Sequence, residues 1–210
     1  LVVASYKFQD VIFIGKPEKG SFRVEDINKK QIKTIKLKDI KKIKINDFSL
    51  PFLVAPPFAT MVHWKMGEKA VNSFYYKSKN KPITVTLDML LPWQMELLCE
   101  EYLREQKILN SKLYQTGKYM KDFDIVGTGK DSKIVIAQVK YKSTPEVITE
   151  FFKQCESIKN SEPYFFTSCD NDKLHKNQVH FSPLEVVFHY FNCNKNKEKR
   201  EYINRLFWGG

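Results

Sequence analysis

The sequence predicts an α/β fold in which a mixed sheet is flanked by helices and is preceded by a smaller β-rich domain. Two observations predict it. Near Pro92 the hydrophobic pattern changes from short β-branched runs to helical spacing. The charge changes at the same place, because residues 1–90 hold 17 Lys+Arg against 8 Asp+Glu, whereas residues 91–210 hold 18 against 16. We therefore expect one domain over residues 1–88 and a second over residues 89–210.

The first part contains runs typical of short strands, and a small barrel or curved sheet is expected. In Ile35–Lys38 the apolar residues alternate with lysines, as in a half-buried antiparallel strand. Aromatic residues then crowd a proline-rich stretch, where most are expected in a core and some could stack on bases. The predicted strands are 11–14, 21–24, 32–37 and 43–45, and the aromatic residues are Phe52, Phe58, Trp64, Phe74, Tyr75 and Tyr76.

Lysines are dense in this first part, and they allow two interpretations. They could form an ordinary solvated face, or a surface that follows the phosphates of a nucleic acid. Arg23 is the sole arginine there, which favours contacts to the backbone over guanine recognition by arginine. The candidate nucleic-acid-binding lysines are Lys33, Lys36, Lys38, Lys41, Lys42 and Lys44.

The second part has the order helix, hairpin, helix, strand, strand, helix. Proline at the first turn favours a helix from Pro92 to Gln106, and Thr144 before Pro145 favours a second to about Lys159. Ser182 followed by Pro183 predicts the start of the last main helix in the same way. The predicted strands are 123–126 and 134–141, joined through Gly127, Gly129 and Asp131, and then 164–168 and 178–181.

Several classes of protein are excluded. No apolar segment reaches the roughly 18 residues that span a bilayer, and no signal peptide is visible, so a cytoplasmic protein without a membrane partner is expected. The cysteines form no CxxC pair and are expected to be reduced, and the histidines have no zinc spacing. These residues are Cys99, Cys155, Cys169 and Cys193, and His63, His175, His180 and His189.

The informative residues lie on the predicted hairpin. Gln138 and Lys140 are two residues apart, so they project from the same face at the end of an apolar strand. Asp124 begins the neighbouring strand and can reach the same region. A carboxylate, a second oxygen donor and a lysine would suit Mg²⁺, with the lysine orienting a water beside a phosphate. The alternative is a salt bridge between Lys140 and Asp122 or Asp124.

This pattern resembles the PD-(D/E)xK nuclease superfamily, which has the restriction-endonuclease-like fold. It is closest to the Mrr-type branch, whose Q-x-K signature matches Gln138–Val139–Lys140. The family also has a glutamate on the helix before the hairpin, in a pattern like F-E-x-L, and the run from Trp93 to Leu98 nominates Glu96. The resemblance covers roughly residues 90–190. It implies that Asp124, the Gln138 oxygen and a backbone carbonyl near Val139 hold the metal.

The sequence departs from the family pattern in two ways. Gln138 is neutral, which leaves fewer anionic ligands than in the acidic version of the motif. Phe123 stands where the motif has proline, so Asp122 competes with Asp124 for the metal. Asp124 is preferred because the β run Ile125–Val126 follows it directly. Glu96 has an alternative interpretation as a helix-surface acid.

The resemblance implies an endodeoxyribonuclease that depends on Mg²⁺, or Mn²⁺, and acts on double-stranded DNA. Restriction or another defence role is favoured over repair, because a separate recognition-like domain suits site selection. Glu96, Asp124, Gln138 and Lys140 would be its catalytic residues. The resemblance also implies a homodimer. Two other classes stay open. One is a non-catalytic nucleic-acid-binding protein with a degenerate nuclease fold, which the neutral Gln138 favours. The other is a protein-interaction module whose lysines only keep it soluble.

Overall fold

The computed structural model describes residues 1–5, 11–44, 68–76, 84–113, 123–168, 179–193 and 196–208. The chain divides into two compact units, and each is described here by itself. Unit 1 comprises Leu1–Met89 and Arg205–Gly210, and unit 2 comprises Leu90–Asn204. The predicted domain bounds, 1–88 and 89–210, stay a prediction that expression of each part alone would test.

Unit 1 contains a three-stranded antiparallel sheet in the order β1-β2-β5. The helix α1 packs on it because β2 alternates, so that Ile12 and Ile14 face Val71 and Tyr75 of α1 in one buried cluster. A shift of register beside Gly15 introduces a bulge between β2 and β5. The bounds are β1 Val2–Ser5, β2 Val11–Pro17, β5 Leu37–Lys44 and α1 Glu68–Tyr76.

The strands β3, Arg23–Ile27, and β4, Lys30–Thr34, form a separate antiparallel pair. The prediction of one strand over 32–37 is therefore wrong. The strand is interrupted at Ile35 and Lys36. The Lys36 N–H donates to the Ser21 hydroxyl and the Lys36 carbonyl accepts from the Glu18 N–H, so Lys36 does not continue the pairing of β3 with β4. The other predicted strands differ at their ends, and neither β1 nor α1 was predicted. Unit 1 is β-rich as expected, and its described strands form no closed barrel.

The aromatic residues predicted near the prolines have different outcomes. Tyr75 is buried in the core of unit 1, whereas Tyr76 is 66% exposed. Phe52, Phe58 and Trp64, and the side chain of Phe74, lie outside the described part. Their predicted packing or stacking is therefore still a prediction.

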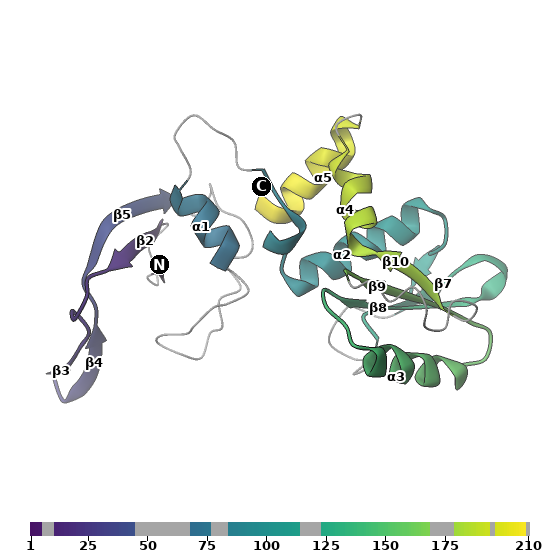
Figure 1. Ribbon diagram of the computed structural model, residues 1–210, viewed down its shortest axis with the longest axis horizontal. Helices are drawn as coiled ribbons and strands as arrows, with labels where there is room; N and C mark the ends of the chain where they lie inside the picture. The colour runs from purple at the N-terminus through teal and green to yellow at the C-terminus, as the bar shows by residue number, and fades with distance from the viewer. Residues whose placement is uncertain are drawn as a thin grey trace. The chain divides into compact units, whose positions relative to one another are not determined.

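Unit 2 is built on a five-stranded mixed sheet in the order β10-β9-β8-β7-β6. β8, β9 and β10 are parallel, while β6 and β7 are antiparallel to their neighbours. The predicted fold class, a mixed sheet with flanking helices after a smaller β-rich part, is confirmed (Figure 1). The bounds are β6 Ser111–Lys112, β7 Ile125–Thr128, β8 Ile134–Lys140, β9 Ser161–Thr167 and β10 His180–Pro183.

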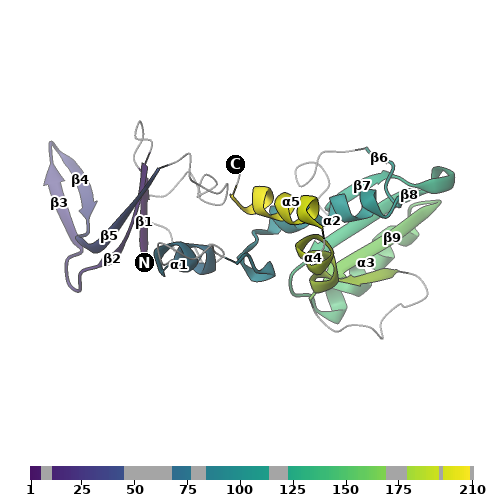
Figure 2. The same cartoon turned by 90° about the horizontal axis from the view of Figure 1, so that it is seen from above.

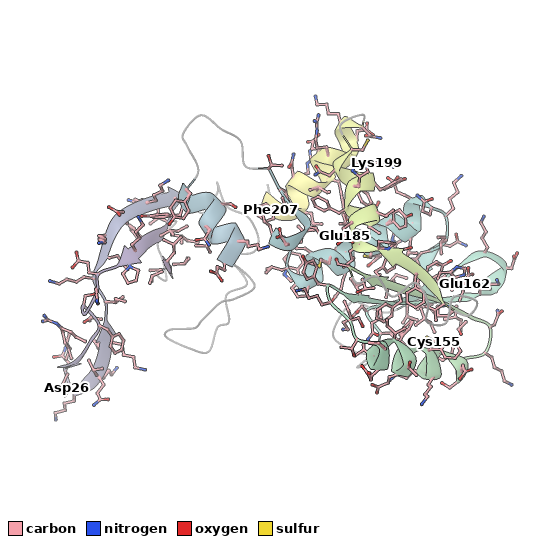
Figure 3. All side chains as sticks on the ribbon, viewed as in Figure 1. Asp26, Cys155, Glu162, Glu185, Lys199 and Phe207 are labelled. Atoms are coloured by element: carbon pink, nitrogen blue, oxygen red, sulfur yellow. The ribbon has the colours of Figure 1, made fainter. Side chains whose placement is uncertain are left out.

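Helices cover both faces of this sheet (Figure 2). Adjacent residues of β9 show the division, because Phe165 packs against Phe151 of α3 while Phe166 contacts Tyr102 of α2. Cys155 completes the α3 side, where it lies near the sheet (Figure 3). The bounds are α2 Pro92–Glu105, α3 Pro145–Glu156 and α4 Leu184–Asn192, with a short 3₁₀ turn at Lys130–Ser132. The helix α5, Lys197–Trp208, begins in unit 2 and ends in unit 1, and unit 1 also contains a 3₁₀ turn at Leu87–Met89.

Three predictions for unit 2 need correction. α3 ends at Glu156, three residues before the predicted end. Ser182 is not the N-cap of α4, because pairing of β10 with β9 keeps it extended; Pro183, the last residue of β10, is the N-cap, and α4 begins at Leu184. Gly127 lies inside β7 rather than in the turn. The residue there must be small, because an added Cβ would lie 2.3 Å from the Ser111 carbonyl oxygen of the adjoining strand.

The remaining expectations concern α5, the cysteines and the membrane. α5 was not predicted. Cys99 and Cys155 are buried free thiols and Cys193 is partly exposed and free, while Cys169 lies outside the described residues. Within the described ranges, no helix is both long and apolar enough to cross a bilayer.

Candidate active site

Asp124 lies immediately before β7, at the end of the β7–β8 hairpin. Its backbone N–H donates to the Ala137 carbonyl, 3.0 Å away, which continues the ladder by one residue. Its carboxylate oxygen Oδ2 accepts a hydrogen bond from the N–H of Val139, at 2.7 Å. Two hydrogen bonds to β8 therefore hold Asp124 at the open end of the β7–β8 hairpin, the position that the sequence predicted.

Lys140 is the last residue of β8 and reaches the same carboxylate. Its Nζ lies 3.8 Å from Asp124 Oδ2, and 41% of its side chain is exposed, against 16% for Asp124. Gln138 precedes it by two residues on the same side of the strand, and its side-chain oxygen Oε1 is buried. The salt bridge between Lys140 and Asp124, which the sequence offered as the alternative to a metal site, is therefore present. That Asp124, Gln138 and Lys140 together hold a metal stays a prediction.

Glu96 lies on α2 and is half-buried. Burial, then the negative charge of Asp124, raise its pKa to about 7, while Lys140 and Lys112 lower it. A helix-surface acid in open water would have no such shift. The structure thus places Glu96 within electrostatic reach of both Asp124 and Lys140, although no direct hydrogen bond joins it to either.

The negative charge of Asp124 disfavours ionisation of Glu96. The pKa of Asp124 is raised by burial, against the lowering influence of the Val139 N–H and Lys140. Such a pair is stabilised by a nearby cation. Among the described residues no group of three or more His, Cys, Asp or Glu forms a metal cluster. A set of two carboxylates with amide and carbonyl oxygens fits Mg²⁺, which takes one or two carboxylates and keeps several waters.

Cys99 lies on α2 close to these acids but is no nucleophile. Its thiol is fully buried, and burial, then Asp124 and Glu96, raise its pKa well above the usual value. A thiol that stays protonated cannot attack a substrate. It belongs to the packing beneath the site.

Glu100, one turn beyond Glu96, is a feature that the sequence interpretation missed. Only 8% of the residue is exposed, and its two oxygens accept from Arg104 at 3.0 Å and from Lys112 at 2.6 Å. The spacing of Glu100 and Arg104, four residues on a helix, was the available signal. These ion pairs hold Lys112 of β6 beside α2, where its charge also lowers the pKa of Glu96.

The predicted lysines of unit 1 are not gathered on one face. Lys41 stands opposite buried Ile14, and its Nζ lies 5.4 Å from the Tyr75 ring centre. Lys42 stands on the other face, 6.0 Å from the Phe13 ring centre. Lys33 lies on β4, Lys36 lies between β4 and β5, and Lys38 and Lys44 are on β5, with the Lys44 side chain outside the described part.

Two further observations bound the candidate site. Asp122, the competitor of Asp124, lies outside the described residues. A hollow of about 480 Å³ lies between α2, β9 and β10, beside Tyr102, Tyr164 and His180, and includes none of the four candidate side chains. The four candidate residues, three at the end of the β7–β8 hairpin and Glu96 on α2, are therefore separate from this hollow.

Comparison with known proteins gives little likeness. No family model and no curated protein matches the sequence. Among solved structures, a repair endonuclease from Pyrococcus abyssi has a TM-score of 0.34 and 19% identity over 43% of this chain and 45% of its own. EndoMS in complex with double-stranded DNA has a TM-score of 0.32 and 10% identity over 51% of this chain and 48% of its own. The chain thus spans less than half of each.

Proposed function

We propose that this protein is a metal-dependent DNA endonuclease that hydrolyses phosphodiester bonds. The observation that carries the proposal is the cluster at the end of the β7–β8 hairpin. There Asp124 Oδ2 accepts a hydrogen bond from the Val139 N–H and lies 3.8 Å from Lys140 Nζ. Glu96 is close enough for the charges of Asp124 and Lys140 to shift its pKa. Acids with raised pKa values beside a lysine, at the end of buried strands, are typical of a catalytic site.

Each residue has a chemical role in this proposal. Asp124, the Gln138 oxygen and the Val139 carbonyl would hold Mg²⁺ or Mn²⁺, with Glu96 tuning the ion. On a strand the N–H and C=O of one residue point to the same side, so the Val139 carbonyl is expected on the side of β8 that carries its bond to Asp124. The metal would supply charge stabilisation at the phosphate. Lys140 would position the attacking water and offset the negative charge that develops in the transition state.

The proposed substrate is double-stranded DNA, and the proposed role is restriction or another form of DNA defence. The cationic surplus of residues 1–90 supports binding to a polyanion, with an affinity that falls as salt rises. Two copies would allow both strands to be cut, so we also propose a homodimer. Light scattering with and without DNA tests this, and a single-chain mass in both would contradict it.

One observation favours a second candidate, a DNA-binding protein without nuclease activity. Gln138 is neutral, and the described residues hold only Glu96 and Asp124 as acids at the site. Fewer anionic ligands weaken the hold on a divalent ion. In this case the hairpin end would bind phosphate through Lys140 alone.

Supercoiled plasmid, methylated and unmethylated, incubated with Mg²⁺ or Mn²⁺ tests the proposal. Wild-type protein is expected to nick or linearise it, and Lys140→Ala to leave it intact. Lys142→Ala is the matched control, because Lys142 is an exposed lysine just beyond the end of β8.

The outcomes separate the candidates. Absence of cleavage by the wild type with either metal, on either DNA, contradicts the enzyme. A gel shift that disappears at high salt would then support the DNA-binding candidate. No shift at all would favour a protein-interaction module.

A further inference from the structure

The β3–β4 hairpin is exposed on both faces. All five residues of β3 are exposed, and so are the first four of β4. Val24, Ile27 and Ile32 are 52%, 44% and 40% exposed, which is unusual for β-branched residues on paired strands. Its side chains extend away from the ribbon on either side, around Asp26 (Figure 3). A two-stranded ribbon of this kind is only marginally stable in water by itself.

The base of the hairpin is nevertheless held firmly. The Ser21 hydroxyl donates to the Glu18 carbonyl at 2.7 Å and accepts from the Lys36 N–H at 3.1 Å. The Glu18 N–H donates to the Lys36 carbonyl at 2.9 Å. These bonds join the two chain segments where they leave the β1-β2-β5 sheet. The hairpin is therefore an arm with a fixed base rather than a loose loop.

The tip of the arm contains an unfavourable residue. Ile27 pairs with Lys30, so Asn28 and Lys29 form a two-residue turn, with φ values of 51° and 63°. Such turns prefer Asn followed by Gly, because glycine alone adopts this backbone without cost. Lys29 occupies the glycine position. A strained lysine at an exposed tip suggests that its charge serves binding rather than folding.

The charges on the arm complement a polyanion. Lys29 lies at the tip, and Lys30 and Lys33 lie on β4 with their side chains on opposite faces of the ribbon. No described residue forms an ion pair with any of the three. Double-stranded DNA has a major groove wide enough for a two-stranded ribbon. The arm also carries Arg23 and Gln31, side chains that bind guanine and adenine edges, and exposed aliphatic side chains that suit the thymine methyl.

We propose that the β3–β4 hairpin is the element that enters the major groove of duplex DNA, with Lys29 and Lys30 at its tip on the bordering phosphates. This rests on the proposed function for its ligand. Glu25 and Asp26 on β3 argue against a ribbon that binds phosphates alone, because their negative charges repel phosphates. They are compatible with a groove, where carboxylates can accept from the cytosine amino group.

The substitution Lys29→Gly tests the arm without risk to the fold. It removes one charge and relieves the strain of the turn, so the variant is expected to be as stable as the wild type or more so. Lys107→Gly is the matched control. Lys107 is also an exposed lysine with a left-handed backbone, φ 56°, but it lies in the turn after α2 in unit 2.

The affinity for a DNA duplex is measured without divalent metal over a range of salt concentrations. Lys29→Gly is expected to bind roughly three- to tenfold more weakly than wild type, and to reduce the slope of log K against log salt by about 1. Lys107→Gly is expected to match the wild type in both. Equal affinity and slope for the two variants would overturn the proposal, as would a wild type that binds no duplex at low salt.

Plasmid cleavage by the same proteins separates this proposal from the proposed function. If the wild type cleaves and Lys29→Gly binds and cleaves as Lys107→Gly does, the arm is not the groove element and the nuclease stands. If Lys29→Gly alone loses affinity and none of the proteins cleaves, the arm stands and the nuclease does not.

Discussion

Two antiparallel hairpins of this protein, β7–β8 and β3–β4, have opposite surroundings. In unit 2 the β7–β8 hairpin is the interior of a sheet, with Ile125, Val135 and Ile136 almost fully buried. In unit 1 the β3–β4 hairpin has nearly every residue exposed. Both carry lysines and acids. Burial perturbs the pKa values at the end of the first, whereas the second presents its charges directly to water.

Under the proposed function, this difference would assign the chemistry to β7–β8 and the binding to β3–β4. Charges in a partly buried place are held at fixed distances and are weakly screened, as catalysis requires. Exposed charges are screened and mobile, and they suit binding to a polyanion over many weak contacts. Substitutions in the two hairpins should therefore differ in what they change, namely the chemistry for β7–β8 and the affinity for β3–β4.

The largest effect is expected for Asp124→Asn. Under the proposed function, cleavage should fall by at least about a hundredfold, because the proposed metal ion would lose a charged ligand. Stability should be unchanged or higher, because the asparagine carbonyl can still accept the Val139 N–H while the disfavoured buried charge is gone. Thermal unfolding and plasmid cleavage measure the two. Asp131→Asn, in the exposed turn of the same hairpin, is the control and should change neither. A loss of stability with the activity would make Asp124 a structural residue.

The next effect, on stability, comes from the lack of room for a side chain at Gly127. Gly127→Ala should destabilise unit 2 by about 2–3 kcal/mol, since its Cβ would meet the Leu109 side chain and the Ser111 carbonyl at 2.3 Å. Gly20→Ala, before β3, meets no atom within 4 Å and has only its φ of 72° to oppose it, so about 1 kcal/mol is expected. Denaturant unfolding of both variants measures the difference. If both variants lose the same free energy of unfolding, Leu109 and Ser111 move aside at little cost and the close contact with Gly127 does not limit stability.

A smaller effect is expected from Glu96, and it depends on pH. Its native pKa of about 7 lies above the ordinary glutamate value of 4.5, so the native state favours the protonated form. Stability from this group is therefore complete below pH 4.5, falls as the pH rises towards 7, and stays low above it. Glu96→Gln should remove this loss and be more stable than wild type above pH 7 by about 1–2 kcal/mol, after allowance for solvent screening of a half-buried group.

Denaturant unfolding between pH 4 and 8 measures the Glu96 effect. The same substitution at an exposed acid, Glu25→Gln, controls for the general loss of negative charge. If the difference in free energy of unfolding between Glu96→Gln and wild type does not grow across this pH range, the raised pKa of Glu96 is contradicted.

The contrast between the hairpins also explains what could be predicted from the sequence. α2 and the β7–β8 pair follow from local apolar spacing, and the two-residue interval places Gln138 and Lys140 on one side of a strand. The break at Ile35 and Lys36 depends on Ser21, fifteen residues away. Likewise the extension of β10 through Pro183 depends on β9. Such pairings between distant segments leave no mark on local periodicity.

The candidate site was predictable to a similar degree. Asp124, Gln138 and Lys140 share one hairpin, so their proximity follows from the sequence alone. Glu96 was named by resemblance, but its raised pKa arises from burial against a sheet that the sequence does not locate. The Glu100 ion pairs were missed because Lys112 comes from a separate two-residue strand.

The smallest effect, at the base of the exposed arm, tests whether that arm is rigid. Ser21→Ala removes the hydroxyl that joins Glu18 to Lys36 and should lower overall stability by less than about 1 kcal/mol, because the bonds are exposed. Hydrogen exchange should nevertheless become faster at the β3 and β4 amides and stay unchanged in β7 and β8, since only the first hairpin depends on that base. Ser157→Ala, whose hydroxyl donates to Gln154 at the end of α3, is the control. If exchange in β3 and β4 does not change, the hydrogen bonds between β3 and β4 hold the arm without Ser21, and the proposed binding of DNA would not depend on this hydroxyl.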